Sequence, residues 1–290
     1  MPAPRDEPDV AEILAATRDP LEPVGSGSRR AVGRPVNAAP LDLSALAGIL
    51  DYEPRELTLT ARAATPLQEI EQALGAHAQR LAFEPPDWSR LLGCPGGTST
   101  IGGVLCSNLS GSRRLSAGAA RDHFLGFRAV SGRGEVFKAG GRVVKNVTGY
   151  DLPKLLAGSW GTLAVLTEVT VRVHPAPELE RTLLLPLEAP AAAIRAMTAA
   201  LASHCDVSAA AFAPTRGVAL RLEGFAPSVE ARARALVSSL EAADGAWLQP
   251  ADSRRFWQAL GAVEPLASCP VVWRLSVPPS EAAAILERLA

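Results

Sequence analysis

Residues 157–173, AGSWGTLAVLTEVTVRV, carry the pattern that decides the fold. A glycine-rich turn runs there directly into the longest strand candidate of the chain. Val169, Val171 and Val173 fall on one face of this segment, and polar residues fall between them. Such a period of two is typical of a half-buried β-strand, so we predict a strand over residues 162–173.

The turn at the start of this strand, Ala157-Gly158-Ser159-Trp160-Gly161, is also a variant of the serine nucleophile elbow, Gly-x-Ser-x-Gly. An elbow needs a strand before the serine and a helix after it. The residues that follow here are β-branched and alternate, which predicts a strand instead. We therefore disfavour a serine hydrolase.

Upstream, residues 25–28 read GSGS. Glycines leave room for backbone N–H groups to turn toward a diphosphate. A Rossmann loop would need glycine at the sixth position and a helix after it, whereas Arg30 stands there and no helical pattern follows. This loop, and the lack of alternating βαβ units, exclude a nicotinamide-dependent Rossmann dehydrogenase.

Three further stretches use the same residue types: TSTIGGV at residues 98–104, SNLSG at 107–111 and KNVTGYDL at 145–152. Paired glycines permit close approach of the backbone, and hydroxyl groups donate to phosphate oxygens. Each stretch alone is also explained by an ordinary turn. Their order and spacing along the chain carry the information.

Charge and composition exclude several classes of protein. The formal net charge of −1 gives no support for a nucleic-acid surface. The four cysteines form no C-x-x-C pair and the four histidines no metal motif, so we expect no metal site. Two arginine groups are either solvated loops or anion sites: Arg29, Arg30 and Arg34, and Arg113, Arg114 and Arg121.

The first residues, MPAPRDEPDVAEILAATRD, are charged and lack an apolar core, so we expect no signal peptide. Charged residues interrupt every long apolar run, which predicts no membrane-spanning helix. We also expect the cysteines to be reduced thiols and the protein to be cytoplasmic.

The strand pattern stops at His174-Pro175-Ala176-Pro177, which predicts a domain boundary after residue 176. Before it, the pattern predicts a helix at residues 10–17, a strand at 57–63 and a second helix, capped by Thr65, at 65–74. It then predicts ordered loops at 93–118 and a hairpin at 127–139. Beyond the boundary, the order strand, helix, two strands and helix is typical of a ferredoxin-like domain. A last strand is predicted at residues 271–277, and a last helix from Ser280.

Four motifs follow one another along the first part of the chain: GSGS at residues 25–28, TSTIGGVLCSN at 98–108, GAARDHFLG at 118–126 and VVKNVTGYDLPKLLAGSWGTLAVLTEVTVRVHP at 143–175. In this order they resemble the FAD domain of the vanillyl-alcohol-oxidase-type (PCMH-type) flavoproteins. GRP at 33–35, FEPP at 83–86 and KNVTGYD at 145–151 are most similar to the E subunits of glycolate oxidases.

The resemblance implies an α+β fold, with a PCMH-type FAD-binding domain of two subdomains over residues 1–176 and a ferredoxin-like α+β cap domain over residues 177–290. It also implies three groups of cofactor-binding residues. The loop around the diphosphate contains Gly25, Ser26, Gly27 and Ser28. The second phosphate wall, with the Arg-Asp segment near the cofactor, contains Thr100, Gly102, Gly103, Asn108, Arg121 and Asp122, and the flavin and adenine side contains Gly158, Gly161, Thr162 and Val165. No catalytic residue is assigned; Tyr150, Arg121 and Lys145 are candidates for contact with substrate or flavin.

Some members of this family attach the flavin covalently through histidine or cysteine. The first loop contains neither, and alanines precede Arg121, so we expect non-covalent FAD. Cys106 in the second motif is expected to be a small buried thiol. His123 is expected to be structural, because no acid–base partner stands beside it in the sequence.

The implied function is that of an FAD-dependent oxidoreductase subunit, which relays electrons from oxidation of a 2-hydroxy acid such as glycolate to glyoxylate. The expected partners are a second flavoprotein subunit and an iron–sulfur subunit of the same complex. The chain is expected in the cytoplasm, or at the inner face of the membrane through that complex, without nucleic acid.

Two departures from the family keep an alternative open. The chain lacks the histidine-rich metal and substrate cluster expected of the catalytic D subunits, which indicates an accessory subunit. It also stops at LERLA, residues 286–290, without the family's proline- and asparagine-rich closing segment, so we expect it to be either naturally short or C-terminally truncated. The alternative function is a non-catalytic scaffold subunit with a degenerate flavin fold.

Overall fold

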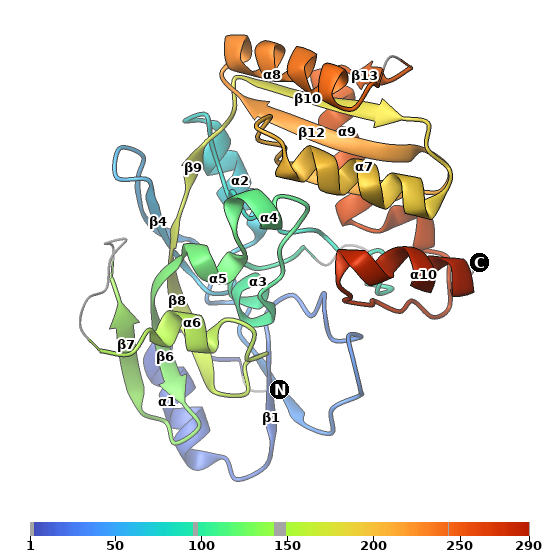
Figure 1. Cartoon of the computed structure of the whole chain (residues 1–290). Helices are drawn as coiled ribbons and strands as arrows, with labels where there is room; N and C mark the ends of the chain where they lie inside the picture. Colours follow the sequence, from blue (N-terminus) through green and yellow to red (C-terminus); the bar gives the residue numbers. More distant parts are fainter. Residues whose placement is uncertain (1–2, 95–97, 142–148, 243, 290) are drawn as a thin grey trace. The chain divides into compact units, whose positions relative to one another are not determined.

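The computed structural model describes residues 3–94, 98–141, 149–242 and 244–289 (Figure 1). The chain forms two compact units. Unit 1 comprises residues 1–111 and 118–175, and unit 2 comprises residues 112–117 and 176–290. Residues 112–117, which the sequence pattern placed in the first domain, therefore belong to the second unit.

Unit 1 is built on an antiparallel sheet with the strand order β3-β4-β8-β6-β7. The predicted long strand is its central strand, β8, and every residue of β8 except Glu168 and Arg172 is buried. The strand is thus covered on both faces rather than on one. The bounds are β3 (Ile49–Glu53), β4 (Thr58–Arg62), β6 (Phe124–Ser131), β7 (Val136–Gly140) and β8 (Ala164–Arg172).

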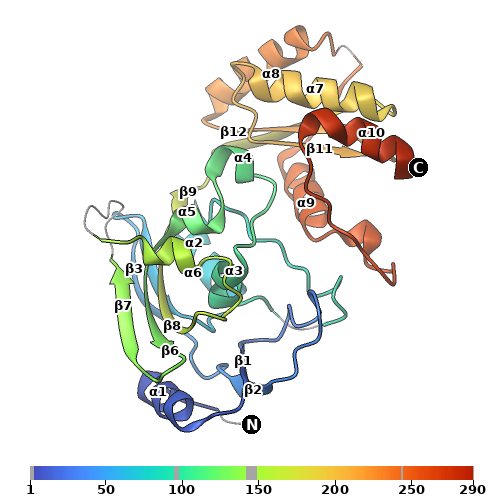
Figure 2. The ribbon, with the colours of Figure 1, turned by 60° about the horizontal axis from the view of Figure 1, so that its bottom comes forward.

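Helices cover both faces of this sheet (Figure 2). On one face, Leu59 and Val169 of the sheet share a core with four helices: α2 (Leu67–Gly75), α3 (Ile101–Ser107), α5 (Ala120–His123) and α6 (Leu152–Leu156). On the other face, Val165 packs in one buried cluster with Val10 of α1 (Glu7–Ala16). Thr167 also donates to Glu7 of α1 (2.7 Å), which fixes the helix on the sheet.

Two short strand pairs complete unit 1. β1 (Leu21–Val24) and β2 (Ala39–Asp42) run parallel and hold both ends of the loop over residues 25–38. Leu41 of β2 is fully buried in the cluster that contains α1. β5 (Gln79–Arg80) pairs with β9 (His174–Pro175) in an antiparallel arrangement.

The prediction of loops over residues 93–118 was wrong, because this stretch contains α3 and α4 (Arg114–Ala117). Thr100 is the N-cap residue of α3, and its Oγ1 accepts the N–H of Gly103 (3.3 Å). Gly102 lies so close to Ala63 that a Cβ on it would meet the Ala63 carbonyl oxygen at 2.7 Å. Paired glycines disfavour an isolated helix, but packing against the rest of unit 1 stabilises this one.

The predicted cap of α2 also differs from the structure. Its N-cap residue is Pro66, without a side-chain hydrogen bond. Thr65 instead donates to the carbonyl oxygen of Arg62 (2.7 Å), so the hydroxyl stabilises the turn before the helix.

Unit 2 contains an antiparallel sheet with the order β11-β12-β10-β13. α7 (Pro190–Ala202) follows the first strand in sequence and α8 (Ala226–Ser239) follows the third, and both pack on one face. This order and these crossovers are those of the ferredoxin-like domain predicted from the sequence. The strands are β10 (Leu179–Leu185), β11 (Ala209–Ala213), β12 (Gly217–Gly224) and β13 (Ala246–Leu248).

The other face of this sheet packs against α9 (Pro250–Gly261), with Trp257 buried between them. Arg113 donates to both carboxylate oxygens of Glu223 of β12, from Nε to Oε2 (2.9 Å) and from Nη2 to Oε1 (2.9 Å). This buried pair ties residues 112–117 to unit 2. Arg113, one of the second group of arginines, therefore stabilises the fold through this ion pair.

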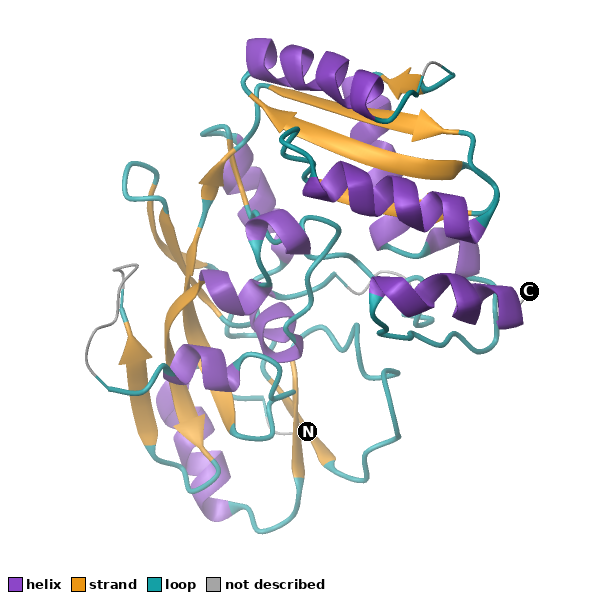
Figure 3. Ribbon diagram, viewed as in Figure 1, coloured by secondary structure: helices purple, strands orange, loops and turns teal. Residues whose placement is uncertain are grey.

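The predicted strand at residues 271–277 was wrong, because these residues form no strand (Figure 3). Their alternation remains visible in the sequence, but no strand of the described chain pairs with them. Trp273 is 84% exposed as a result. The short helix η1 (Glu264–Leu266) precedes the segment, and the predicted last helix, α10 (Pro279–Leu289), follows it.

Adjacent glycines at the end of β7 provide a test of this fold. Gly140 has φ +71°, and a Cβ on it would lie 2.0 Å from the carbonyl oxygen of Leu125. We expect Gly140→Ala to destabilise the protein by more than the ~1–2 kcal/mol that the left-handed conformation alone costs, because β6 and β7 must also separate. Gly141→Ala is the control, since nothing lies within 4 Å of its Cβ. Thermal unfolding followed by circular dichroism compares the two, and equal melting temperatures would contradict the structure.

Candidate functional site

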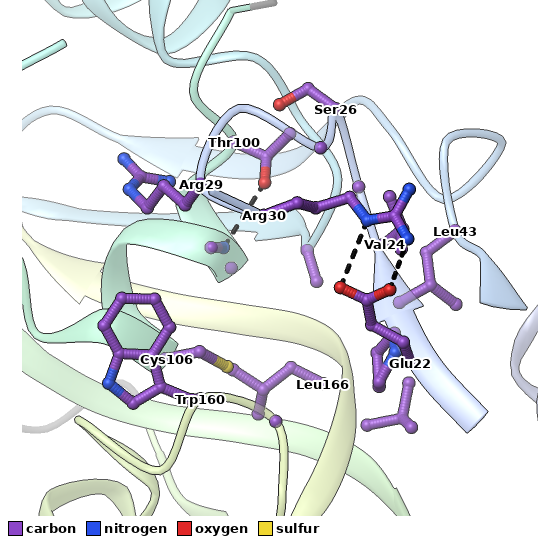
Figure 4. A pocket seen from close by; sticks show the side chains of 18 of the residues that line it. Glu22, Val24, Ser26, Arg29, Arg30, Leu43, Thr100, Cys106, Trp160 and Leu166 are labelled. Atoms are coloured by element: carbon purple, nitrogen blue, oxygen red, sulfur yellow. Dashed lines mark hydrogen bonds and ion pairs between the residues drawn. The ribbon is translucent and has the colours of Figure 1, made fainter. Parts of the chain in front are cut away.

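A pocket of about 370 Å³ lies in unit 1 (Figure 4). Residues 21–30 form one wall, Thr100, Gly102 and Gly103 form a second, and residues between 160 and 166 form a third. The walls come from β1 and the loop after it, the first turn of α3, and the turn that leads into β8. Three of the glycine-rich motifs therefore meet at one place.

The first wall is a loop with unused backbone donors. Gly27 has φ +73°, and its carbonyl oxygen accepts the N–H of Arg30 (3.2 Å), which reverses the chain. In the part of the chain that the structure describes, the N–H groups of residues 25–29 donate to no acceptor. Because polar backbone groups need partners, a run of free donors beside a pocket favours an anion there.

The second wall approaches the first around one hydroxyl group. A Cβ on Gly25 would lie 3.0 Å from Oγ1 of Thr100, and a Cβ on Gly103 would lie 3.1 Å from the same oxygen. Glycine at both positions therefore lets the loop and the helix come together. Ser28 is buried in the same loop and accepts a hydrogen bond from Ser26 (3.2 Å).

The third wall is mainly apolar. Trp160 has φ +56°, a conformation that bulky residues rarely adopt. Its N–H donates to the carbonyl oxygen of Cys106 (2.9 Å), which ties the turn to α3. Half of the Trp160 side chain is exposed, and Ala164 and Leu166 extend the wall from β8. This side of the pocket offers a flat aromatic group and small apolar residues to a ring.

Two neighbouring arginines in the first wall have different partners (Figure 4). Arg30 donates to both carboxylate oxygens of Glu22 (3.1 and 2.6 Å), and this hydrogen-bonded partner raises the pKa of Arg30. Arg29 donates from Nη2 to the hydroxyl of Ser99 (2.9 Å), and its buried Nε has no partner among the described residues. Burial lowers the pKa of Arg29 to about 10, so the side chain remains cationic at neutral pH.

Cys106 borders the pocket beside Trp160 (Figure 4). Burial raises the pKa of its thiol to about 11. The group is therefore a protonated thiol at neutral pH, although the residue is half-buried rather than buried as expected from the sequence.

Most of the predicted cofactor-binding residues line this pocket. They are Gly25, Ser26, Gly27, Ser28, Thr100, Gly102, Gly103, Gly161, Thr162 and Val165. The predicted residues outside the lining are Asn108, Arg121, Asp122 and Gly158. The contacts of both sets with a cofactor stay predictions.

The four residues outside the lining make structural contacts near the C-terminal end of α3. Asn108 is the C-cap residue with φ +49°, and its Oδ1 accepts the N–H of Arg121 (3.0 Å). Asp122 accepts the N–H of Ala119 (2.8 Å) at the start of α5. A Cβ on Gly158 would lie 3.7 Å from that of Asn108. These contacts fix the segments that follow the second wall.

The other candidates lie apart from the pocket or outside the described chain. Tyr150 is 90% exposed and does not line the pocket. Lys145 lies outside the described residues. His123 is buried, with its ring centroid 5.3 Å from that of Phe83 and 5.2 Å from that of His174. The structural role expected for His123 stays a prediction.

Sequence reasoning missed several lining residues. Pro23 lies 3.5 Å from the position of a Cβ on Gly161, and Leu43 and Ala63 reach the pocket from segments without a glycine motif. No sequence signal marks these three. Trp160 had a signal, because a large aromatic residue stands between glycines in the turn before β8.

The chemistry of the residues present fits FAD. A diphosphate requires several donors and benefits from a cation; the N–H groups of residues 25–29 are such donors, and Arg29 is such a cation. Flat rings require apolar contact, which Trp160 and Leu166 supply. Within the described ranges, no cluster of three His, Cys, Asp or Glu residues could hold a metal ion. Every helix found in those ranges is too short or too polar to span a bilayer.

Comparisons with known proteins found an FAD-binding family model and several related chains. A family model described as an FAD binding domain matches residues 2–140. The chain is 37% identical over 268 residues to glycolate oxidase subunit GlcE of Escherichia coli (strain K12), covering 90% of this chain and 69% of that protein. It is 34% identical over 187 residues to glycolate oxidase subunit GlcD of Bacillus subtilis (strain 168), covering 63% of this chain and 38% of that protein.

A solved structure of alkyldihydroxyacetonephosphate synthase has the same fold. It aligns with a TM-score of 0.69 over 91% of this chain and 55% of that chain, at 19% sequence identity. The likeness concerns the fold alone. This chain therefore spans only part of the length of each of these proteins.

The raised pKa of Cys106 predicts its reactivity. Because the thiolate is the reactive form, iodoacetamide at about pH 8 should modify Cys106 far more slowly than the exposed Cys269. Peptide mass spectrometry of the folded protein measures both rates, and unfolding in urea should make the two rates similar. Equal alkylation of the two cysteines in the folded protein would contradict the raised pKa of Cys106.

Proposed function

This chain belongs to the family of FAD-linked oxidoreductases that contains the E and D subunits of glycolate oxidase, and from this premise we propose that it is the FAD-binding subunit of a glycolate oxidase complex. It binds FAD non-covalently and relays electrons from the oxidation of glycolate to glyoxylate. The observation that carries the proposal is the pocket in unit 1, where three glycine-rich motifs meet.

FAD, when bound, supplies the redox chemistry of such a subunit. The chain's own residues bind and orient it. The free N–H groups of residues 25–29 donate to the diphosphate, and the glycines at 25 and 103 keep side chains out of the approach. Trp160 and Leu166 pack against a ring and exclude water from that side.

The pocket supports non-covalent binding. Cys106 is the only cysteine or histidine among the described residues that line it. Its raised pKa keeps the sulfur protonated and therefore a poor nucleophile. The described lining thus offers no activated side chain for attachment of the flavin.

We assign residues 1–176 to the FAD-binding domain, apart from residues 112–117 of the second compact unit, and residues 177–290 to a cap domain. Related chains are named as E and D subunits of glycolate oxidase, which supports assembly into a multi-subunit complex. In that complex, the partners are a second flavoprotein subunit and an iron–sulfur subunit. The complex lies in the cytoplasm or at the inner face of the membrane.

Gly103→Asp tests the cofactor site. Its side chain would begin 3.0 Å from Nη1 of Arg29, so the new carboxylate would neutralise that cation and repel a diphosphate. We expect FAD affinity to fall about 100-fold or more, which corresponds to about 2.7 kcal/mol. Titration of the apoprotein by flavin fluorescence measures this change.

Gly132→Asp is the matched control, because nothing lies within 4 Å of its Cβ. It should retain the FAD affinity of the wild type. Full flavin content in purified G103D would contradict the assignment of the pocket. A wild-type chain that binds no FAD would favour the scaffold function instead.

The electron-relay role predicts how the FAD-loaded chain responds to substrate. Under anaerobic conditions, glycolate alone should leave its visible absorbance unchanged, and addition of the second flavoprotein subunit should then bleach it. Stopped-flow spectroscopy follows both additions, with buffer in place of glycolate as the control. Bleaching of the isolated chain would show that glycolate is oxidised on this chain and would contradict the relay role.

A further inference from the structure

The first arginine group contains a partly buried cation, Arg29, that has no ion pair among the described residues. Arg30 is paired with Glu22, and Arg34 is an exposed residue at the pocket margin. Arg29 makes no ion pair within the described chain, although the carboxylate of Asp87 is near enough to act on it electrostatically. Of the three arginines, Arg29 is therefore both partly buried and without a bonded acid.

The position of Arg29 is fixed at one end. Nη2 donates to Ser99, which is itself buried (4% exposed). Nη1 lies over Gly103, because a Cβ on that residue would be 3.0 Å from it. The guanidinium therefore packs on the first turn of α3, next to Thr100 (Figure 4). Glycine at position 103 is what leaves room for it.

The third nitrogen of the group is unsatisfied. Nε of Arg29 is buried and has no hydrogen-bond partner among the described residues. A buried donor on a charged group is costly to leave unpaired, and the cost falls when an anion binds. The free N–H groups of residues 25–29 belong to the same wall of the pocket. Arg29 lines that wall as well, so a cation and free backbone donors lie on the same side of the pocket.

We propose that Arg29 is the cation that binds the diphosphate of FAD, through the charge of its guanidinium group. The inference rests on the proposed FAD-binding function and adds a charged residue to a site otherwise made of backbone N–H and hydroxyl groups. A guanidinium suits this position because charge-assisted hydrogen bonds to phosphate are stronger than neutral ones.

Three ligands separate this role from a structural one. FAD contains the diphosphate and the flavin, ADP contains a diphosphate without the flavin, and riboflavin contains the flavin without phosphate. For Arg29→Met, we expect the apoprotein to bind FAD and ADP about 10- to 100-fold more weakly, as for loss of a hydrogen bond to a charged group. Riboflavin affinity should stay within about twofold of the wild type, because no phosphate is involved.

Isothermal titration calorimetry measures the affinities for the three ligands, and two further variants complete the test. Arg133→Met removes an exposed arginine from the β6–β7 turn and should leave all three affinities unchanged. Arg29→Lys keeps the charge but loses Nε and the planar geometry, so FAD and ADP should bind about three- to tenfold more weakly. R29K carries the test if R29M does not fold, with circular dichroism as the check on folding.

The outcomes distinguish failure of the Arg29 proposal from failure of the proposed FAD-binding function. If the wild type binds FAD and the Arg29 variants bind FAD and ADP equally well, Arg29 is not the diphosphate cation, although the FAD site stands. If the variants lose riboflavin as strongly as FAD, Arg29 acts only as a structural support and the inference fails. If the wild type binds neither FAD nor ADP, the proposed function itself fails.

Discussion

The pocket depends on the close contact between the loop after β1 and the first turn of α3. Gly25 and Gly103 both approach the hydroxyl of Thr100 to distances at which a Cβ would be crowded. The same hydroxyl accepts the N–H of Gly103 and so fixes the start of the helix. Because β1 and β2 hold both ends of the loop, its backbone donors stay at the pocket wall. Any larger side chain at this contact would separate the two walls.

The third wall is tied to the same helix. Trp160 donates from its backbone to Cys106 of α3, and β8 then continues into the centre of the five-stranded sheet. The charges around the pocket follow from these contacts: Glu22 neutralises Arg30, the thiol of Cys106 is protonated, and Arg29 retains an unsatisfied donor. The described wall therefore combines neutral and cationic donors on one side with an apolar surface on the other. That combination matches a cofactor with a diphosphate and flat rings.

Periodic sequence signals predicted several of the regular elements, including β8, although that strand is covered on both faces. The central strand β8, the helices α1, α2 and α7, and the strand and helix order of unit 2 all follow such patterns. The helix α3 could not be predicted in this way, because its paired glycines disfavour a helix and only tertiary packing stabilises it. The segment at 271–277 shows the opposite error, since alternation predicts a strand only where a sheet edge is available to pair with it. In the site, motif residues were found readily, whereas the different partners of Arg29 and Arg30 depend on where Glu22 and Ser99 lie in the fold.

The visible absorption spectrum of the purified chain, before and after acid precipitation, tests the central claim most directly. A site with free diphosphate donors and an apolar ring surface should retain FAD through purification or take it up when it is added. Flavin bands that move to the supernatant after precipitation are the predicted result, because no activated side chain is described in the pocket. A colourless protein that does not take up added FAD, or flavin that stays with the pellet, would contradict non-covalent FAD binding in this pocket.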